Sequence, residues 1–238
     1  MFTQERVDGR CLNELRPPSV TFGHLTRADG SCRFQLGDSV ALCSVTGPVE
    51  AKTQFSSHLG MYIDVIVRPN TGMTTPRERL IEQQLSALLN ACVEISKFPY
   101  TQMTVAVEIS SDDGSISSVV NNSAVLAVMN SGIAMRFIPL CICIAQRSDG
   151  QTILDPDAAE EATCKSIVCQ AVNLMSGEVV QSSTSGDSEP FGAMSLCQAA
   201  ALALEPFIRK FLEVHLGPLL NPSRYSSLVF QLSIVTWL

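Results

Sequence analysis

The sequence predicts an α/β (α+β) protein in which mixed β-sheets pack with helices. The first observation behind this fold class is that apolar segments with strand character alternate along the chain with segments of helical apolar spacing. The second is that turn and helix-capping residues separate those segments. The third is the length, because 238 residues can form one domain with a sizeable core. We therefore expect a single domain over residues 1–216 and an apolar C-terminal extension without clear period over residues 217–238.

Four strands are predicted in the N-terminal part of the chain, the first three as a meander. Turn residues at Asp29-Gly30 and at Gly37-Asp38 separate the strands of the meander. Pro69 ends the fourth strand, because proline has no N–H to donate to a sheet. The four strands are predicted over residues 19–27, 31–36, 39–46 and 61–68.

The clearest helix signal follows the loop after Pro69. Thr75 is a suitable N-cap, Pro76 fits the first helical position, and Glu78 can close a capping box with Thr75. The segment Lys97-Phe98-Pro99 is expected to end this helix. Its predicted buried stripe consists of Ile81, Leu85, Leu88, Cys92 and Ile95.

The rest of the chain repeats the order of strand and helix. We expect a tight turn at Asp149-Gly150. The longest apolar run, residues 137–145, suits a buried strand and is too short to cross a membrane. The predicted elements are strands over 101–110, 137–145, around Ile153, 166–173 and 178–182, and helices over 117–132 and 189–214.

Composition limits the function classes. Hydrophobic residues make up 46% of the chain, charged residues 16%, and the mean hydropathy is +0.22, so we expect part of the apolar surface to meet other subunits. The formal net charge is −7 and no basic cluster is present, which argues against a protein that holds nucleic acid by itself. The N-terminus lacks a basic stretch leading into an apolar one, so no secretory signal is expected.

An ordered set of short motifs spans roughly residues 6–210. In this order and at these intervals they resemble the RNase PH family of phosphorolytic RNA exonucleases, which includes the ring subunits of exosomes. The resemblance implies the ribosomal protein S5 domain 2-like fold. The motifs are Arg6-Val7-Asp8-Gly9-Arg10, Asn13-Glu14-Leu15-Arg16-Pro17, Ala28-Asp29-Gly30-Ser31, Gly37-Asp38-Ser39-Val40, Thr46-Gly47-Pro48-Val49-Glu50, Ile66-Val67-Arg68-Pro69, the run 77–82, Asp113-Gly114-Ser115, Asp149-Gly150 and Leu154-Asp155-Pro156.

The turn over residues 112–118 is predicted to lead from a strand into the N-terminus of a helix, where free N–H groups and the helix dipole can bind an anion. The family has Gly-Ser/Thr-Arg here, and the resemblance implies that the arginine binds the attacking phosphate. This chain has Ile116 after Ser115. The resemblance also implies an acidic pair beyond Asp155, and here Glu161 takes the first position and Ile167 the second. We therefore predict a degenerate site without catalytic residues.

Arg77 and Arg79 lie in the first turn of the helix that Thr75 caps, where cations oppose the helix dipole. The matching basic positions of the family line the channel and touch RNA. These two arginines are therefore candidates for RNA or interface contact. The alternative, an arginine pair that is solvated or bridges Glu78 or Glu82, stays open at this point.

No metal site and no cofactor are predicted. Cys141 and Cys143 share a strand face, yet no second pair at zinc-finger spacing accompanies them, so the nine cysteines are expected to be core thiols in a reducing compartment. Asp112 and Asp113 could suggest Mg²⁺, but Asp before Gly is ordinary turn chemistry. Three scattered histidines without a paired nucleophile argue against a Ser/His or Cys/His enzyme.

The resemblance implies a non-catalytic structural subunit of the RNA exosome core ring, which supports 3′–5′ RNA processing and degradation by completing the RNA channel. Its implied partners are other RNase PH-like ring subunits, cap proteins with RNA-binding domains, a separate hydrolytic nuclease and RNA in the shared channel, with no membrane. The implied compartments are nucleus, nucleolus and cytoplasm. Two alternatives remain: an active phosphate-dependent 3′–5′ exoribonuclease, and a nucleic-acid-binding module outside a ring, which the acidic balance disfavours.

Overall fold

The structure is a computed structural model that describes residues 6, 8–147, 150–186 and 194–216. The strands form two sheets, one of five strands in the order β1-β2-β3-β5-β4 and one of four in the order β7-β6-β8-β9. The strands are β1 Pro18–Phe22, β2 Gly30–Leu36, β3 Ser39–Glu50, β4 Tyr62–Pro69, β5 Thr101–Ser111, β6 Pro139–Gln146, β7 Thr152–Leu154, β8 Ser166–Asn173 and β9 Val179–Gly186. The helices are α1 Pro76–Cys92, the 3₁₀ turn η1 Ile95–Lys97, α2 Ile116–Asn130, α3 Ala158–Thr163 and α4 Met194–Leu216.

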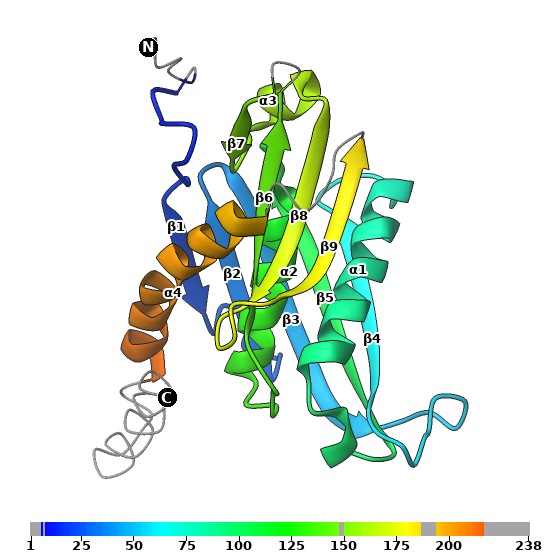
Figure 1. The fold of residues 1–238 in the computed structure, drawn as a ribbon. Coiled ribbons are helices and arrows are strands. Elements are labelled where there is room, and N and C mark those ends of the chain that lie inside the picture. The colour runs from blue at the N-terminus through cyan, green and yellow to red at the C-terminus, as the bar shows by residue number, and fades with distance from the viewer. Residues whose placement is uncertain (1–5, 7, 148–149, 187–193, 217–238) are drawn as a thin grey trace.

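The five-stranded sheet is mixed, because β4 pairs parallel with β5 while the other pairs are antiparallel. The four-stranded sheet is antiparallel throughout. Helix α2 lies between the sheets and contacts β2 and β3 on one side and β6 on the other (Figure 1). The α/β class with sheets packed against helices is therefore confirmed, although only the five-stranded sheet is mixed.

Helix α2 is buried on all sides because it lies between two apolar sheet faces. Its sequence is accordingly rich in small and β-branched residues rather than amphipathic. The strand β2 approaches it so closely that a Cβ on Gly30 would lie 2.4 Å from the carbonyl oxygen of Ala127. Only glycine allows this approach without a backbone shift.

Helix α1 has the predicted start. Pro76 is its first residue, and the Glu78 carboxylate accepts from the Thr75 amide at 2.6 Å, which closes the capping box. The predicted end is wrong, because Val93 is extended and bridges Met135. The helix therefore stops at Cys92, and the last predicted stripe residue, Ile95, belongs to η1.

The ends of several other strands and helices differ from the predicted ends by a few residues. The first strand ends at Phe22, because Gly23 has φ +67 and its amide donates to Ser31. Strands β3 and β9 run four residues further than predicted, and the short helix α3 was not predicted at all. The predicted starts of the turn at Asp149 and of the helix at residue 189 lie outside the described residues, as does the predicted extension over residues 217–238. Among the described residues, no helix is long and apolar enough to cross a membrane.

Candidate functional site

The predicted anion cradle forms between β5 and α2, but side chains of the protein already accept from the amides of residues 113–115. The amide of Asp113 donates to Ser39 Oγ at 3.0 Å, and that of Gly114 donates to Asp112 Oδ1 at 3.2 Å. The amide of Ser115 donates to Glu161 Oε1 at 2.6 Å. The N-terminus of α2 therefore binds a carboxylate that the chain itself supplies.

Two residues of this turn have left-handed backbones. Gly114 has φ +82, and a Cβ on it would lie 2.5 Å from the carbonyl oxygen of Pro156, so the turn needs glycine here. Ser115 has φ +53 and donates from its buried hydroxyl to the same Pro156 carbonyl at 2.9 Å. Ser115 therefore fastens the turn to the segment before α3 and does not point into solvent.

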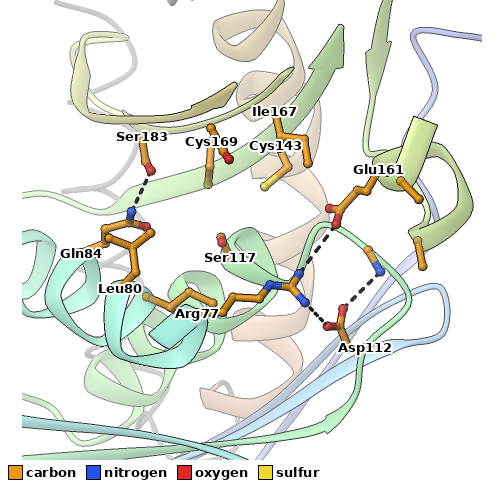
Figure 2. Close-up of a pocket in the computed structure, with 15 residues that line it drawn as sticks. Arg77, Leu80, Gln84, Asp112, Ser117, Cys143, Glu161, Ile167, Cys169 and Ser183 are labelled. Carbon is orange, nitrogen blue, oxygen red and sulfur yellow. Dashed lines mark hydrogen bonds and ion pairs between the residues drawn. The ribbon is translucent and has the colours of Figure 1, made fainter. Parts of the chain in front are cut away.

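Glu161 comes from α3, and its side chain is 17% exposed. Burial raises the pKa of this carboxyl above its ordinary value, although the hydrogen bond from Ser115 and the charge of Arg77 act in the opposite direction. Arg77 Nη2 lies 3.7 Å from Glu161 Oε2, and Arg77 Nη1 lies 2.7 Å from Asp112 Oδ2. Figure 2 shows Arg77 pointing between these two acids.

An open pocket of about 470 Å³ lies beside this cluster, between α1, α3 and the strands β8 and β9. Its wall opposite Arg77 includes Ile167 and Cys169, with Ser183 beside them (Figure 2). The residues that line it are Arg77, Leu80, Ile81, Gln84, Asp112, Gly114, Ser117, Cys143, Ala158, Glu161, Ala162, Ile167, Cys169, Ser183 and Ser185.

The two positions at which the sequence departs from the family pattern lie in different surroundings. Ile116 is 2% exposed and packs in the main core, and it does not line the pocket. Ile167 does line the pocket, so an apolar side chain stands where the resemblance implies the second acid. The structure thus brings Glu161, Ile167 and Arg77 together and leaves Ile116 in the core.

The two candidate arginines, Arg77 and Arg79, differ in their ion pairs. Arg77 pairs with Asp112 and Glu161, so the sequence-based alternative of a bridge to Glu78 or Glu82 is wrong for this residue. Its side chain is 51% exposed at the rim of the pocket. Arg79 is exposed, and its side chain makes no hydrogen bond or ion pair within the described part of the chain.

Asp155 is a buried anchor of the site. Its backbone is left-handed at φ +51, and its carboxylate accepts from Arg16 Nε at 2.8 Å and from Arg16 Nη2 at 2.7 Å. Arg16 also donates to the carbonyls of Asp113 and Gly114, at 2.8 and 3.2 Å. Arg16 and Asp155 therefore connect the segment before β1, the turn before α2 and the end of β7.

A second buried pair supports α3. Arg6 donates through Nε to Glu160 at 2.9 Å and also contacts the carbonyls of Leu154 and Asp155, both at 2.8 Å. Asp157 and Glu160 close a capping box at the start of α3. The roles of Arg6 and Arg16 were missed from the sequence, whereas the Asp157-x-x-Glu160 spacing was a signal that could have revealed α3.

Two cysteines, Cys143 and Cys169, lie on the pocket wall. Cys143 and Cys169 face each other across β6 and β8. The hydrogen bond with Cys143, together with burial, raises the pKa of the Cys169 thiol, and burial raises that of Cys92 to about 12. Within the described ranges, no three His, Cys, Asp or Glu side chains are placed to hold a metal ion.

Comparison with known proteins identifies relatives of this chain. The family described as "3′ exoribonuclease family, domain 1" (RNase PH) matches residues 14–134. The exosome complex exonuclease RRP46 homolog of Oryza sativa subsp. japonica is 32% identical over 163 residues, which are 68% of each chain. The exosome complex component RRP46 of Saccharomyces cerevisiae is 29% identical over 212 residues, 82% of this chain and 95% of that one.

Solved structures agree with these matches. The crystal structure of rice Rrp46 has a TM-score of 0.83 to this chain at 29% identity, covering 87% of this chain and 100% of the rice one. The resemblance to the RNase PH family, and within it to ribosomal RNA-processing protein 46, is therefore confirmed.

Replacing Asp155 by Asn should lower the free energy of unfolding by about 3–5 kcal/mol, because Arg16 would lose its buried countercharge and the Asp113 carboxylate, 3.4 Å away, is exposed. Asn keeps the shape of Asp and also accepts a left-handed backbone, so the change isolates the charge. Asp112→Asn is the matched control; it breaks the exposed pair with Arg77 and should cost less than about 1 kcal/mol. Urea unfolding measures both, and equal losses would contradict the anchoring role of Asp155.

Glu161→Gln should change how stability depends on pH. Because the folded-state pKa of Glu161 is raised, its contribution to stability is fully present below the ordinary glutamate pKa and is lost as pH rises through the folded value. The wild type should therefore lose stability relative to Glu161→Gln between about pH 5 and about pH 8.

Glu78→Gln provides a control of opposite sign. The hydrogen bond from Thr75 lowers the pKa of Glu78, so its contribution is present above the ordinary value and is lost as pH falls. Urea unfolding should therefore give pH slopes of opposite sign in two windows. The wild type should gain stability relative to Glu78→Gln as pH rises from about 3 to about 5, and lose it relative to Glu161→Gln as pH rises from about 5 to about 8. The same slope for both would show that Glu161 does not titrate as its burial implies.

Proposed function

The chain belongs to the RNase PH family of 3′ exoribonucleases, and we propose that it is a non-catalytic subunit of the RNA exosome core ring. One observation carries the proposal: the Glu161 carboxylate sits on the Ser115 amide at the N-terminus of α2. Repulsion between this carboxylate and a phosphate dianion would oppose phosphate binding at the same amide. The core position of Ile116 leaves that anion without a guanidinium group from this turn.

The proposed work of the subunit is to complete the ring and its RNA channel, and so to support 3′–5′ RNA processing and degradation. The relatives named as exosome components support this assignment. The expected partners are other RNase PH-like ring subunits, cap proteins with RNA-binding domains, and a hydrolytic nuclease that cuts the RNA. Nucleus, nucleolus and cytoplasm are the expected compartments. Residues 1–216 would be the RNase PH-like domain, with 217–238 as an extension.

Of the two candidate arginines for RNA contact, Arg77 and Arg79, only one is without an acidic neighbour in an ion pair within the described residues. Arg77 lies between two carboxylates, which offset its charge. Arg79 is exposed on the same helical turn, so it is the better candidate for a phosphate contact.

The alternative function is an active phosphate-dependent 3′–5′ exoribonuclease. The rice relative is named an exonuclease, and the pocket beside α2 is open, which are the two observations in its favour. Against it, removal of one charge partner of a transition state costs about a hundred- to a thousandfold in rate. Here both the turn arginine and the second acid are isoleucines.

The purified protein, alone or in its ring, should release no nucleoside diphosphates from the 3′ end of single-stranded RNA in phosphate buffer. Ile116→Arg alone should not restore release, because Glu161 still holds the Ser115 amide and Ile167 replaces an acid. Thin-layer chromatography of end-labelled products would measure this, with an active RNase PH at equal concentration as positive control. Phosphate-dependent release that Glu161→Ala abolishes would establish the alternative.

Arg79→Glu should weaken RNA binding by the assembled ring and lower its salt dependence by about one phosphate contact. Arg77→Glu would also break two ion pairs, so Arg79 gives the cleaner test. Arg27→Glu, the same charge change at an exposed turn, is the matched control. Affinity at two salt concentrations, with complexes of equal mass, provides the measurement. If Arg79→Glu and Arg27→Glu behave alike, Arg79 does not contact RNA.

A further inference from the structure

One end of the five-stranded sheet carries exposed apolar and aromatic side chains that the candidate site does not use. We name them the distal aromatic patch. The exposed fractions are 49% for Val49, 75% for Leu59, 37% for Tyr62 and 57% for Tyr100. Phe55, the fifth member, is half-buried. Scattered single apolar residues are normal on a surface, but a contiguous group of them usually marks an interaction site.

Sheet pairing and ring stacking bring Val49, Tyr62 and Phe55 together. Val49 and Tyr62 are register partners of the same β5 residue, Gln102, on its two sides. The ring of Phe55 stacks on that of Tyr62, with centroids 4.4 Å apart and an interplanar angle of 8°. Leu59 lies in the connection between β3 and β4, which projects at this end of the sheet (Figure 1).

Tyr100 is held in an unfavourable conformation that keeps it exposed. Its φ is +61, in the left-handed region that favours glycine. Its amide donates to the Ser57 carbonyl at 2.9 Å, and its own carbonyl accepts from Ala51 at 3.0 Å. The β3–β4 connection thus holds the backbone of Tyr100, while its ring gains little burial in return. Backbone strain of this kind concentrates at functional positions.

We propose that the distal aromatic patch docks a protein subunit whose surface has an apolar centre and carboxylates at its rim. Lys52, His58 and Lys97 are exposed around the patch, so a partner with acidic residues at its edge would complement them, while Glu50 is the exposed acid beside Val49. Tyrosines surrounded by aliphatic side chains are typical centres of protein interfaces. The exposed aliphatic side chains of Val49 and Leu59 favour a protein partner over RNA, because RNA binding relies on aromatic stacking and basic side chains.

The inference rests on the proposed function in one respect, namely that the partner is a subunit of the same assembly. The patch and the pocket lie toward opposite ends of α1. Arg77 of the first turn borders the pocket, whereas Ile95, just beyond the last turn, accepts from Met61 beside the patch. A 17-residue helix is about 25 Å long. The patch is therefore a surface separate from the pocket.

The test uses the chain co-expressed with the RNase PH-like and cap subunits of its exosome. Leu59→Ser and Tyr100→Gly should each weaken its association with the purified partner complex at least tenfold. Their melting temperatures should stay unchanged or, for Tyr100→Gly, rise, since glycine relieves the left-handed backbone. Met73→Ser and Met175→Ser, at side chains 91% and 58% exposed elsewhere, are matched controls and should bind as the wild type does.

A photo-crosslinking amino acid at position 59 or 100 of the assembled complex, with RNA present, identifies the occupant. Crosslinks to one protein subunit support the inference; crosslinks to RNA, or none, overturn it. If the wild type assembles and both variants bind equally well, the patch is not a docking surface and the proposed function stands. If Tyr100→Gly melts lower, Tyr100 is structural, which also contradicts the inference. Failure of the wild type to assemble contradicts the proposed function and this inference together.

Discussion

The buried ion pair between Arg16 and Asp155 joins three parts of the chain that meet at the pocket. Arg16 comes from the segment before β1, Asp155 follows β7, and the same guanidinium donates to the carbonyls of Asp113 and Gly114 in the turn before α2. One side chain therefore contacts both the turn before α2 and the segment that leads into α3. Because α3 begins directly after this anchor, Glu161 reaches the Ser115 amide.

The charges around the site largely compensate one another. Arg6 is paired with Glu160, Arg16 with Asp155, and Arg77 with Asp112 and Glu161. A site that binds phosphate needs cations and free amides directed at the ligand. Here the chain's own carboxylates pair with the arginines, and the Glu161 carboxylate also accepts from the Ser115 amide. The fold of the family is thus retained, and an internal salt-bridge network holds the turn before α2.

Local signals in the sequence predicted much of the fold. Thr75, Pro76 and Glu78 fixed the start of α1, because capping depends on neighbours in the chain. The end of α1 was wrong, since it is decided by the pairing of Val93 with Met135, a tertiary contact. The short α3 has no apolar period of its own, so only its capping box could have indicated it. Arg16 and Asp155 lie 139 residues apart, and no local pattern links them. The absence of an arginine at Ile116 was visible in the sequence, whereas the carboxylate that occupies the turn was visible only in three dimensions.

Titration of the purified protein with inorganic phosphate, followed by calorimetry and by the phosphorus-31 NMR line width, measures most directly whether Glu161 fills the anion position. With the Glu161 carboxylate on the Ser115 amide and Arg77 paired with two acids, we expect no saturable binding at neutral pH and millimolar phosphate. Saturable binding that disappears in the Arg77→Met variant would contradict this, because it would show that the turn accepts an external phosphate despite its internal carboxylate.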